Sequence, residues 1–289
     1  VRPVIVDEAA RAGGQIYRQG AAPRGSARQR YGFEWRRAQA IHAAGADLAA
    51  RADYLAGTAV WNAAPGSLDL VSRGQLETLP YSRLLLATGA TDRVLPFAGW
   101  TLPGVYSLGG AQIALKSQNC VFGPRIVFAG TGPLLYLVAY QYARAGARVQ
   151  AVLDSAPMSG QARAMPALLN QPGMLAKGLY YLGWLRARGV PVHHGAQLES
   201  AQGVSRVEGV RARIGGETRL IPCDALAAGH GLRAETQLAD LLDCAFEFDP
   251  AQRAWLPRRD ADGRSSVAGV YLAGDGAGIG GAVLAELAG

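Results

Sequence analysis

The chain has 289 residues, of which 49% are hydrophobic, and this length fits two domains better than one. No apolar run approaches the roughly 20 residues that a membrane span requires, so a transmembrane segment is not expected. The three cysteines, Cys120, Cys223 and Cys244, are too far apart for a paired-thiol or zinc motif. We therefore expect unpaired, buried thiols, a cytoplasmic location and no bound metal.

The charge is positive, with a formal net value of +7. Only Lys116 and Lys177 are lysines, so 27 of the 29 basic residues are arginines, which we read as a compositional bias. No motif indicates nucleic acid as a partner. One cluster, residues 24–37 (RGSARQRYGFEWRR), can meet a phosphate, a membrane surface or an acidic partner; the alternative is a solvated loop that runs into a helix. Peripheral association with a membrane therefore stays open.

The first predicted element is a buried strand at residues 4–6, which ends at Asp7 and Glu8 and is followed by Gly13-Gly14. This order is typical of the second strand of a dinucleotide-binding unit, with an acid for a ribose and a glycine pair close to the cofactor. Glu8 is the better-placed acid, because Asp7 points to the opposite face. The strand, glycine turn and helix that should precede this strand are absent, so we expect the sequence to be truncated there, and likewise at Gly289, where the last helix is cut off.

The next segment, residues 33–50, predicts an amphipathic helix in which His42 packs and does not act as a base. Three short alternating segments then predict a three-stranded meander: residues 58–61, 68–71 and 77–79.

Residues 84–90 (LLLATGA) predict a buried strand that ends in a small Thr-Gly turn. An exposed apolar connector around Phe97, Trp100 and Val105 follows and is a candidate docking edge; for Trp100, packing in the core is an equal alternative.

Residues 125–154 contain the central motif of the chain. A buried strand ends in Gly130-Thr131-Gly132, an apolar pattern at helical spacing follows, and a second strand ends at Asp154. This is the βαβ dinucleotide unit, in which the glycines bring phosphates to a helix N-terminus and the acid accepts from a ribose hydroxyl. Leu135 stands at the third fingerprint position, where a small residue would allow close helix–strand packing. This departure argues against the standard nicotinamide pose but not against the fold.

The following region repeats the plan of the first half. Its expected elements are a helix at 166–188 broken at 172–173, a strand at 190–193, a small meander at 205–214 and 217–221, and a strand with a small turn at 225–231. His193, His194 and His230 are scattered along it without an obvious serine, cysteine or carboxylate partner, so none is expected to be a catalytic base.

The last motif is GDGAGIGGA at residues 274–282, where a strand runs into Asp275 among glycines and a helix follows toward Gly289. A carboxylate at a strand end, beside a new helix N-terminus, suits a hydroxylated linker with phosphates nearby. This motif therefore favours a flavin dinucleotide.

Together these residues resemble the two-dinucleotide-domain flavoproteins, a superfamily that includes glutathione reductase and ferredoxin reductases. More narrowly, GGQIYR (13–18), PFAGWTLPGV (96–105), GTGPLLYLVA (130–139) and GDGAGIGGA (274–282) resemble the FAD subunits of opine oxidases. These are related to the B subunit of hydrogen cyanide synthase and to the alpha subunits of dye-linked proline and hydroxyproline dehydrogenases.

The resemblance implies an α/β fold with two Rossmann-like, three-layer dinucleotide-binding domains, each with a small β-meander. The FAD-binding domain would comprise residues 1–117 and 241–289, and the second nucleotide-binding domain residues 118–240. The implied FAD-binding residues are Glu8, Gly13, Gly14, Gln15, Val60, Ala87, Thr88, Gly89, Gly274, Asp275, Gly280 and Gly281. The implied residues of the second site, for NAD(H) or an adenine nucleotide, are Gly130, Gly132, Pro133, Leu134, Asp154 and Gly229.

One departure from the superfamily excludes a class of activity. Its disulfide reductases carry paired redox cysteines soon after the glycine pair, whereas here Gly14 is followed by Gln15-Ile16-Tyr17. Without a cysteine pair, thiol–disulfide chemistry is not expected.

The expected function is that of the FAD-containing subunit in a heteromeric dehydrogenase or oxidase. It would act on the C–N bond of amino acids, imino acids or opines, together with a second, amine-oxidase-like subunit, and pass electrons to a non-thiol acceptor. Two alternatives stay open: an NAD(P)H-dependent flavin reductase, and a non-catalytic nucleotide-binding scaffold. No residue of this chain is identified as catalytic.

Overall fold

The computed structural model describes residues 2–20, 31–160, 169, 172–281, 285 and 287. The chain forms two compact units, one from Val1–Thr91 with Leu232–Gly289 and the other from Asp92–Gly231. Residues 24–30 of the arginine cluster and most of the helix expected after Asp275 lie outside the described residues.

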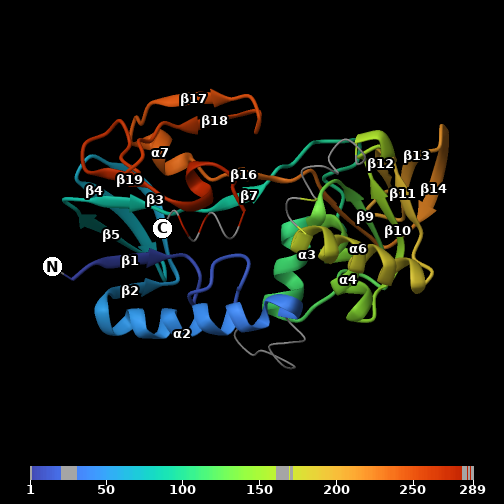
Figure 1. The fold of residues 1–289 in the computed structure, drawn as a ribbon, viewed down its shortest axis with the longest axis horizontal. Coiled ribbons are helices and arrows are strands. Elements are labelled where there is room, and N and C mark those ends of the chain that lie inside the picture. Colours follow the sequence, from blue (N-terminus) through green and yellow to red (C-terminus); the bar gives the residue numbers. More distant parts are fainter. Residues whose placement is uncertain are drawn as a thin grey trace. The chain divides into compact units, whose positions relative to one another are not determined.

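The second unit is built around one parallel sheet (Figure 1), whose strands run in the order β11-β10-β9-β15-β8. The sheet strands are β8 (Val105–Ser107), β9 (Arg125–Gly130), β10 (Arg148–Asp154), β11 (Val192–His194) and β15 (Ala225–Gly229). The helical elements are α3 (Leu108–Ile113), the π-turn η2 (Ala114–Gln118), α4 (Pro133–Arg144) and α6 (Pro172–Ala187). The expected βαβ unit is thus present as β9, α4 and β10.

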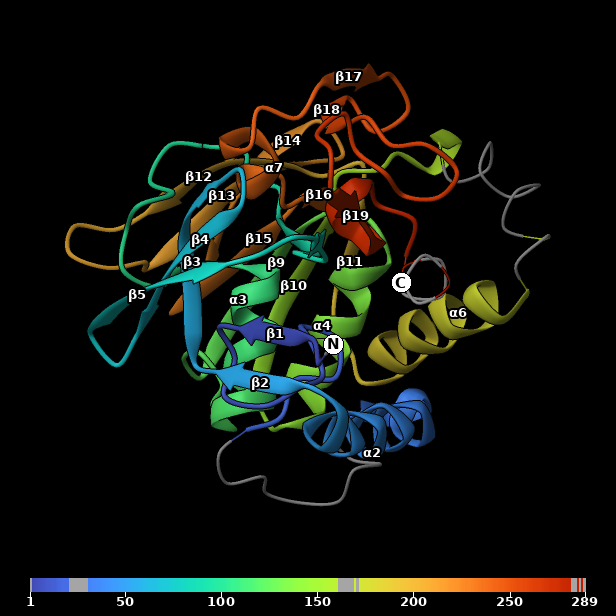
Figure 2. The same cartoon turned by 90° about the vertical axis from the view of Figure 1, so that its left-hand side faces the viewer.

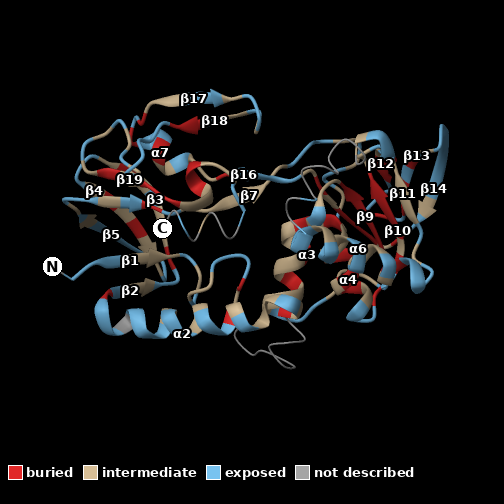
Figure 3. Ribbon diagram, viewed as in Figure 1, coloured by how far each residue is buried: buried red, intermediate tan, exposed pale blue. Residues whose placement is uncertain are grey.

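The sheet of this unit is covered on both faces. Ile126 and Phe128 of β9 pack with the helices, against Val138 and Tyr142 of α4. The alternate residues of β9 face the other way, into a second cluster formed with the antiparallel sheet β12 (Gln197–Gln202), β13 (Gly209–Ile214) and β14 (Glu217–Pro222). Figure 3 shows β9 and β10 as buried strands. Burial on both faces explains the continuous apolar run of β9.

The apolar connector around Phe97, Trp100 and Val105 packs partly against this core. Phe97 and Val105 pack against the meander-side cluster, and Val105 begins β8, which pairs with β15. Trp100 is 44% exposed. The prediction of an exposed docking edge is therefore wrong for Phe97 and Val105, and residues 92–117 pack with the second unit because β8 and α3 contribute to its sheet and helix layer.

The first unit contains several small sheets. Its elements are β1 (Val4–Asp7), η1 (Gly32–Glu34), α2 (Trp35–Arg51), β2 (Asp53–Ala56), β3 (Thr58–Ala64), β4 (Ser67–Ser72), β5 (Gln75–Pro80), β6 (Leu84–Leu86), β7 (Ala90–Asp92), β16 (Leu232–Ala234), α7 (Gln237–Leu241), β17 (Phe246–Asp249), β18 (Ala254–Pro257), β19 (Val270–Leu272) and η3 (Gly274–Ala277). The predicted helix and meander are confirmed as α2 and β3–β4–β5. In Figures 1 and 2, β1, β2 and α2 lie side by side.

Some local predictions are corrected. The strand at residues 4–6 exists, but Val4 is 42% exposed, because β1 pairs only with β2 within the described residues. Likewise Leu85 of β6 is 57% exposed. The thiols of Cys223 and Cys244 are buried as expected, whereas Cys120 is exposed. The strand expected at 190–193 is β11, which begins two residues later.

The expected fold class, α/β with a parallel sheet in a dinucleotide-binding arrangement, is confirmed. No helix within the described part of the chain is long and apolar enough to cross a membrane.

Candidate cofactor sites

The first candidate site lies where two parallel strands of the first unit end. β6 pairs with β19 so that Leu86 lies opposite Leu272, and each strand ends there in a turn. β6 leads into residues 87–89 (Ala-Thr-Gly), and β19 leads into η3. Ligands of α/β proteins bind beyond the carboxyl ends of parallel strands, so the pairing places both predicted FAD motifs at one edge.

The two turns are in contact. A Cβ atom added to Gly276 would lie 2.5 Å from Thr88 Oγ1 and 3.4 Å from the backbone nitrogen of Gly89. The Thr88 hydroxyl donates a 2.5 Å hydrogen bond to the carbonyl of Glu235, and the Glu235 amide donates to the Gly89 carbonyl at 3.0 Å. The Thr88 side chain is therefore fixed by a hydrogen bond to the protein, and a methyl group at position 276 fits only if Thr88 Oγ1 moves away.

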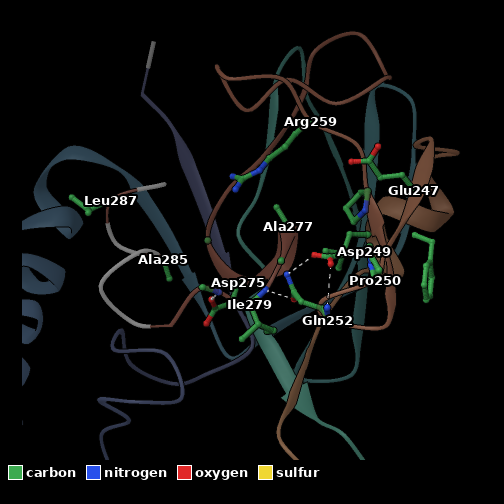
Figure 4. A pocket seen from close by; sticks show the side chains of 16 residues that line it. Glu247, Asp249, Pro250, Gln252, Arg259, Asp275, Ala277, Ile279, Ala285 and Leu287 are labelled. Carbon is green, nitrogen blue, oxygen red and sulfur yellow. Dashed lines mark hydrogen bonds between the residues drawn. The ribbon is translucent and has the colours of Figure 1, made fainter. Parts of the chain in front are cut away.

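Asp275 lines an open pocket of about 770 Å³ beside this contact (Figure 4). Its Oδ1 accepts from the Gly280 amide at 3.1 Å. The pocket lining includes Gln252, whose Oε1 accepts from the Ile279 amide at 2.8 Å and whose Nε2 donates to Asp249 Oδ2 at 3.0 Å. A half-buried carboxylate beside closely approaching backbone is what the hydroxyls and phosphates of a flavin dinucleotide require, so these residues fit FAD.

The remaining residues expected at the FAD site lie near the start of the chain and in β3. Glu8 is exposed directly after β1. Gly13 adopts φ 135°, and a Cβ there would lie 2.5 Å from the Tyr17 carbonyl, while Gly14 adopts φ 55°. Gln15 accepts from Arg18 Nη1 at 3.1 Å.

Val60 packs against the core cluster of the first unit. Ala87 is exposed at the start of its turn, and Gly274 and Gly281 adopt φ values of 63° and 87°.

The second candidate site lies in the parallel sheet, between β9 and β15. β9 lies between β10 and β15 in the sheet. The strand that follows β9 in the chain, β10, pairs with one edge of β9, and the later strand β15 pairs with its other edge, so the strand order reverses at β9. Gly130 and Gly229 end these strands in register, and a Cβ added to Gly130 would lie 1.7 Å from the Gly229 carbonyl oxygen. The Thr131 amide also donates to that oxygen at 3.1 Å. Gly130 is therefore required by the fold.

At Gly132, in contrast, a side chain would not clash with the rest of the protein. Gly132 adopts φ 87° as the N-cap of α4, and a Cβ there would meet nothing within 4 Å. Pro133 occupies the first turn of α4 and Leu134 follows it. The N–H groups at a helix N-terminus can bind an anion, so this turn is a candidate phosphate site. Leu135 is fully buried within the helix-side core.

Asp154 ends β10 directly opposite Gly130, as expected for a ribose acceptor. Its side chain is only 3% exposed. Tyr136 donates to Oδ2 at 2.5 Å, the Ala156 amide donates to Oδ1 at 2.9 Å, and His194 Nδ1 lies 3.6 Å from Oδ2. The expectation that His194 has no carboxylate partner is therefore wrong.

Comparisons with known proteins agree with this geometry. The family model described as pyridine nucleotide-disulphide oxidoreductase matches residues 18–289. The chain belongs to this family. The expected resemblance is confirmed, and membership supports an oxidoreductase with FAD as its cofactor.

Two curated relatives match much of the chain. The A subunit of opine oxidase from Agrobacterium tumefaciens is 36% identical over 300 residues, covering 100% of this chain and 59% of the relative. The hydrogen cyanide synthase subunit HcnB of Pseudomonas aeruginosa is 38% identical over 229 residues, covering 74% of this chain and 48% of the relative. The chain thus spans about three fifths of the length of the first relative.

Among solved structures, thioredoxin reductase of T. acidophilum aligns with a TM-score of 0.65 and 20% identity, covering 98% of this chain and 84% of that protein. This likeness supports the fold alone.

The other histidines, His42, His193 and His230, are all partly buried. Burial lowers the pKa values of His193 and His230, with Arg219 also contributing at His193. His42 Nε2 lies 2.7 Å from the Tyr17 carbonyl, and its ring meets Tyr31 edge-on. Across the described ranges, no three His, Cys, Asp or Glu side chains gather in a way that could hold a metal ion.

Sequence reasoning missed several residues that shape these sites. Gln252 and Glu235 contact the two FAD motifs from segments with no recognised motif, and Tyr136 reaches Asp154 from α4. None carries a spacing signature, because each contact joins segments that only the folded sheet brings together.

Proposed function

We propose that this chain is the FAD-containing subunit of a heteromeric dehydrogenase or oxidase. The complete complex would break a C–H bond next to the nitrogen of an amino acid, imino acid or opine. Its electrons would pass to a non-thiol acceptor. The observation that carries the proposal is the contact between the 87–89 turn and Gly276, beside a pocket lined by Asp275.

The residues have separable roles in this proposal. The backbone of 88–89 and 274–276 would approach the pyrophosphate, since Gly276 leaves no side chain between the two turns. Asp275 would accept from ribityl hydroxyls, and Glu8 from the adenosine ribose. When bound, the flavin would supply the two-electron chemistry.

Partnership with another chain is supported by the names of the relatives. The opine oxidase and hydrogen cyanide synthase relatives are both named as subunits. We therefore assign substrate oxidation to a second, amine-oxidase-like subunit. The proposed location is the cytoplasm, where peripheral association with a membrane stays open. Cysteine chemistry in the electron path is disfavoured, because Cys223 and Cys244 are buried and no cysteine pair follows Gly14.

A second nucleotide site is proposed in the sheet of the second unit. Gly132, Pro133 and Leu134 would present the α4 N-terminus to phosphate, Gly130 and Gly229 would form its floor, and Asp154 would face the ribose. The open space above Gly132 supports this assignment. NAD(H) and a plain adenine nucleotide are both compatible with it.

The test is to express the full-length protein with and without its genomic neighbour and to measure dye reduction. Proline, hydroxyproline, octopine and nopaline are the substrates, and NADH is a separate reductant. Turnover that requires the partner supports the proposal, whereas substantial turnover by the lone chain with any of the four would refute partner dependence. Bleaching of the flavin by NADH alone would favour the reductase alternative, and a protein that binds nucleotide but no flavin would favour the scaffold.

A further inference from the structure

The ribose acceptor of the proposed second site is already occupied by the protein. Asp154 lies at the end of β10, next to the glycine turn that follows β9, where a bound nucleotide would present its ribose. Yet its carboxylate accepts from the Tyr136 hydroxyl and from the Ala156 amide, and its side chain is only 3% exposed. Because so little of the carboxylate is exposed, a ribose hydroxyl can reach it only if one of the surrounding donors moves aside.

Tyr136 is the donor that can move. It stands in the first turn of α4, three residues after Pro133, and is partly buried against the helix-side core. The Ala156 amide is part of the backbone turn that follows β10, where the Ser155 amide also donates to the Gly130 carbonyl at 2.7 Å. A side-chain rotation frees Oδ2, whereas freeing Oδ1 requires the backbone to rearrange.

His194, at the end of β11, is a second side chain next to Asp154 Oδ2. Arg186 Nη2 lies 3.3 Å from His194 Nε2, and a guanidinium can only donate, so Nε2 accepts and Nδ1 carries the hydrogen. Nδ1 faces the Tyr136 hydroxyl at 3.4 Å and Asp154 Oδ2 at 3.6 Å. Both neighbours of Oδ2 are therefore donors from the protein.

We propose that Tyr136 is a specificity-determining residue of the second unit, because its hydroxyl competes with ribose hydroxyls for Asp154. The inference rests on the proposed nucleotide site. It implies that the chain binds ligands bearing a ribose less tightly than its glycine turn and acid would otherwise allow. Ligands that use only the phosphate-facing turn at Gly132 are unaffected.

The experiment uses the full-length, FAD-saturated protein, so that ADP does not report on the flavin site. Calorimetry measures ADP, NADH and inorganic pyrophosphate binding to the wild type, Tyr136→Phe and the matched control Tyr140→Phe. Tyr140 lies one turn further along α4, with its hydroxyl bonded to Arg144 and not to Asp154. Tyr136→Phe should tighten ADP and NADH on the order of tenfold, the equivalent of one charge-assisted hydrogen bond, and leave pyrophosphate unchanged.

The outcomes separate the two ideas. If pyrophosphate and ADP bind the wild type but Tyr136→Phe does not tighten ADP, the competition is refuted and the nucleotide site stands. If no protein binds any of the three ligands, the nucleotide site fails and the inference with it. Tightening by Tyr140→Phe as well would also refute a specific role for Tyr136. Tyr136→Leu serves as a second variant that also removes the hydroxyl, since leucine is a strong helix former.

Discussion

Gln252 and Ile279 are 27 residues apart in the chain and share a 2.8 Å hydrogen bond, from the Ile279 amide to Gln252 Oε1. The bond ties the turn between β17 and β18 to the glycine segment that follows Asp275. The side-chain Nε2 of Gln252 donates to Asp249 Oδ2. Asp249 Oδ1 accepts from the backbone amides of Ala251 and Gln252. The side chain therefore fixes one wall of the proposed flavin pocket.

Gln252→Ala should weaken FAD binding about fivefold, the effect of losing one hydrogen bond worth about 1 kcal/mol from the pocket wall. Fluorescence titration of the apoprotein measures the affinity. The matched control is Gln75→Ala, which removes an exposed glutamine from β5 of the same unit. Equal FAD affinities for both variants would show that the bond does not shape the cofactor site.

Gly276→Ala should separate the two FAD motifs, because its new methyl group would lie 2.5 Å from Thr88 Oγ1. We expect FAD affinity to fall by about 5- to 150-fold, as measured by equilibrium dialysis, since the steric cost is on the order of 1–3 kcal/mol. The double variant Gly276→Ala with Thr88→Ala removes the clashing atom and should regain part of the affinity. An additive loss in the double variant would contradict a direct contact.

The ion pair between Arg125 and Asp224 predicts a pH dependence of stability. Arg125 donates to Asp224 through Nε at 3.0 Å and Nη2 at 2.7 Å, and this hydrogen bonding lowers the pKa of Asp224 from 3.8. Because the folded-state pKa lies below the unfolded value, the pair stabilises the fold above pH 3.8 and the contribution is lost as the pH falls through the folded pKa.

Asp224→Asn should therefore lower the melting temperature at pH 7, and the difference from the wild type should shrink as the solution is acidified. Thermal denaturation at several pH values measures this, with Asp262→Asn as an exposed control. The effect is small, because the pair is partly exposed and screened by solvent. A difference independent of pH would point to packing at Asp224 and not to its charge.

The three thiols should react at different rates. Burial raises the pKa of Cys223 to about 12, so almost no thiolate forms at neutral pH, whereas Cys120 is exposed. Native iodoacetamide treatment followed by mass spectrometry should label Cys120 first, and all three residues should react at similar rates in denaturant. Rapid native labelling of Cys223 would contradict its burial.

Regular periodicity made some elements predictable from sequence. The helical spacing of apolar residues located α2 and α4, and the alternation of apolar residues located the β3–β4–β5 meander. The hairpin β17–β18 and strand β12 were missed, because strands of four to six residues are too short for periodicity to decide between a strand and a loop.

The candidate sites were predictable in part for a related reason. Glycine and acid at the ends of strands mark a turn near a ligand, so Asp154 and Asp275 could be named in advance. Their surroundings could not be, because Tyr136, His194 and Gln252 reach them across the fold from positions set by sheet order and not by spacing.

The two glycines of the central turn should differ sharply in what they tolerate. A methyl group on Gly130 would lie 1.7 Å from the Gly229 carbonyl oxygen, which is backbone and cannot turn aside, so Gly130→Ala should cost more than about 4 kcal/mol of stability or prevent folding of the second unit. Gly132 adopts φ 87° and ψ 175° with open space around it, so Gly132→Ala carries only backbone strain of about 1–3 kcal/mol.

Urea unfolding monitored by circular dichroism compares the two variants, and pyrophosphate calorimetry on Gly132→Ala examines the ligand. Since the new methyl group projects into the space that a phosphate would enter, Gly132→Ala should lose pyrophosphate binding while it keeps its fold. Similar stabilities for the two variants would overturn the structural role of Gly130. Unchanged pyrophosphate affinity in Gly132→Ala would mean that phosphate does not approach α4 through this turn.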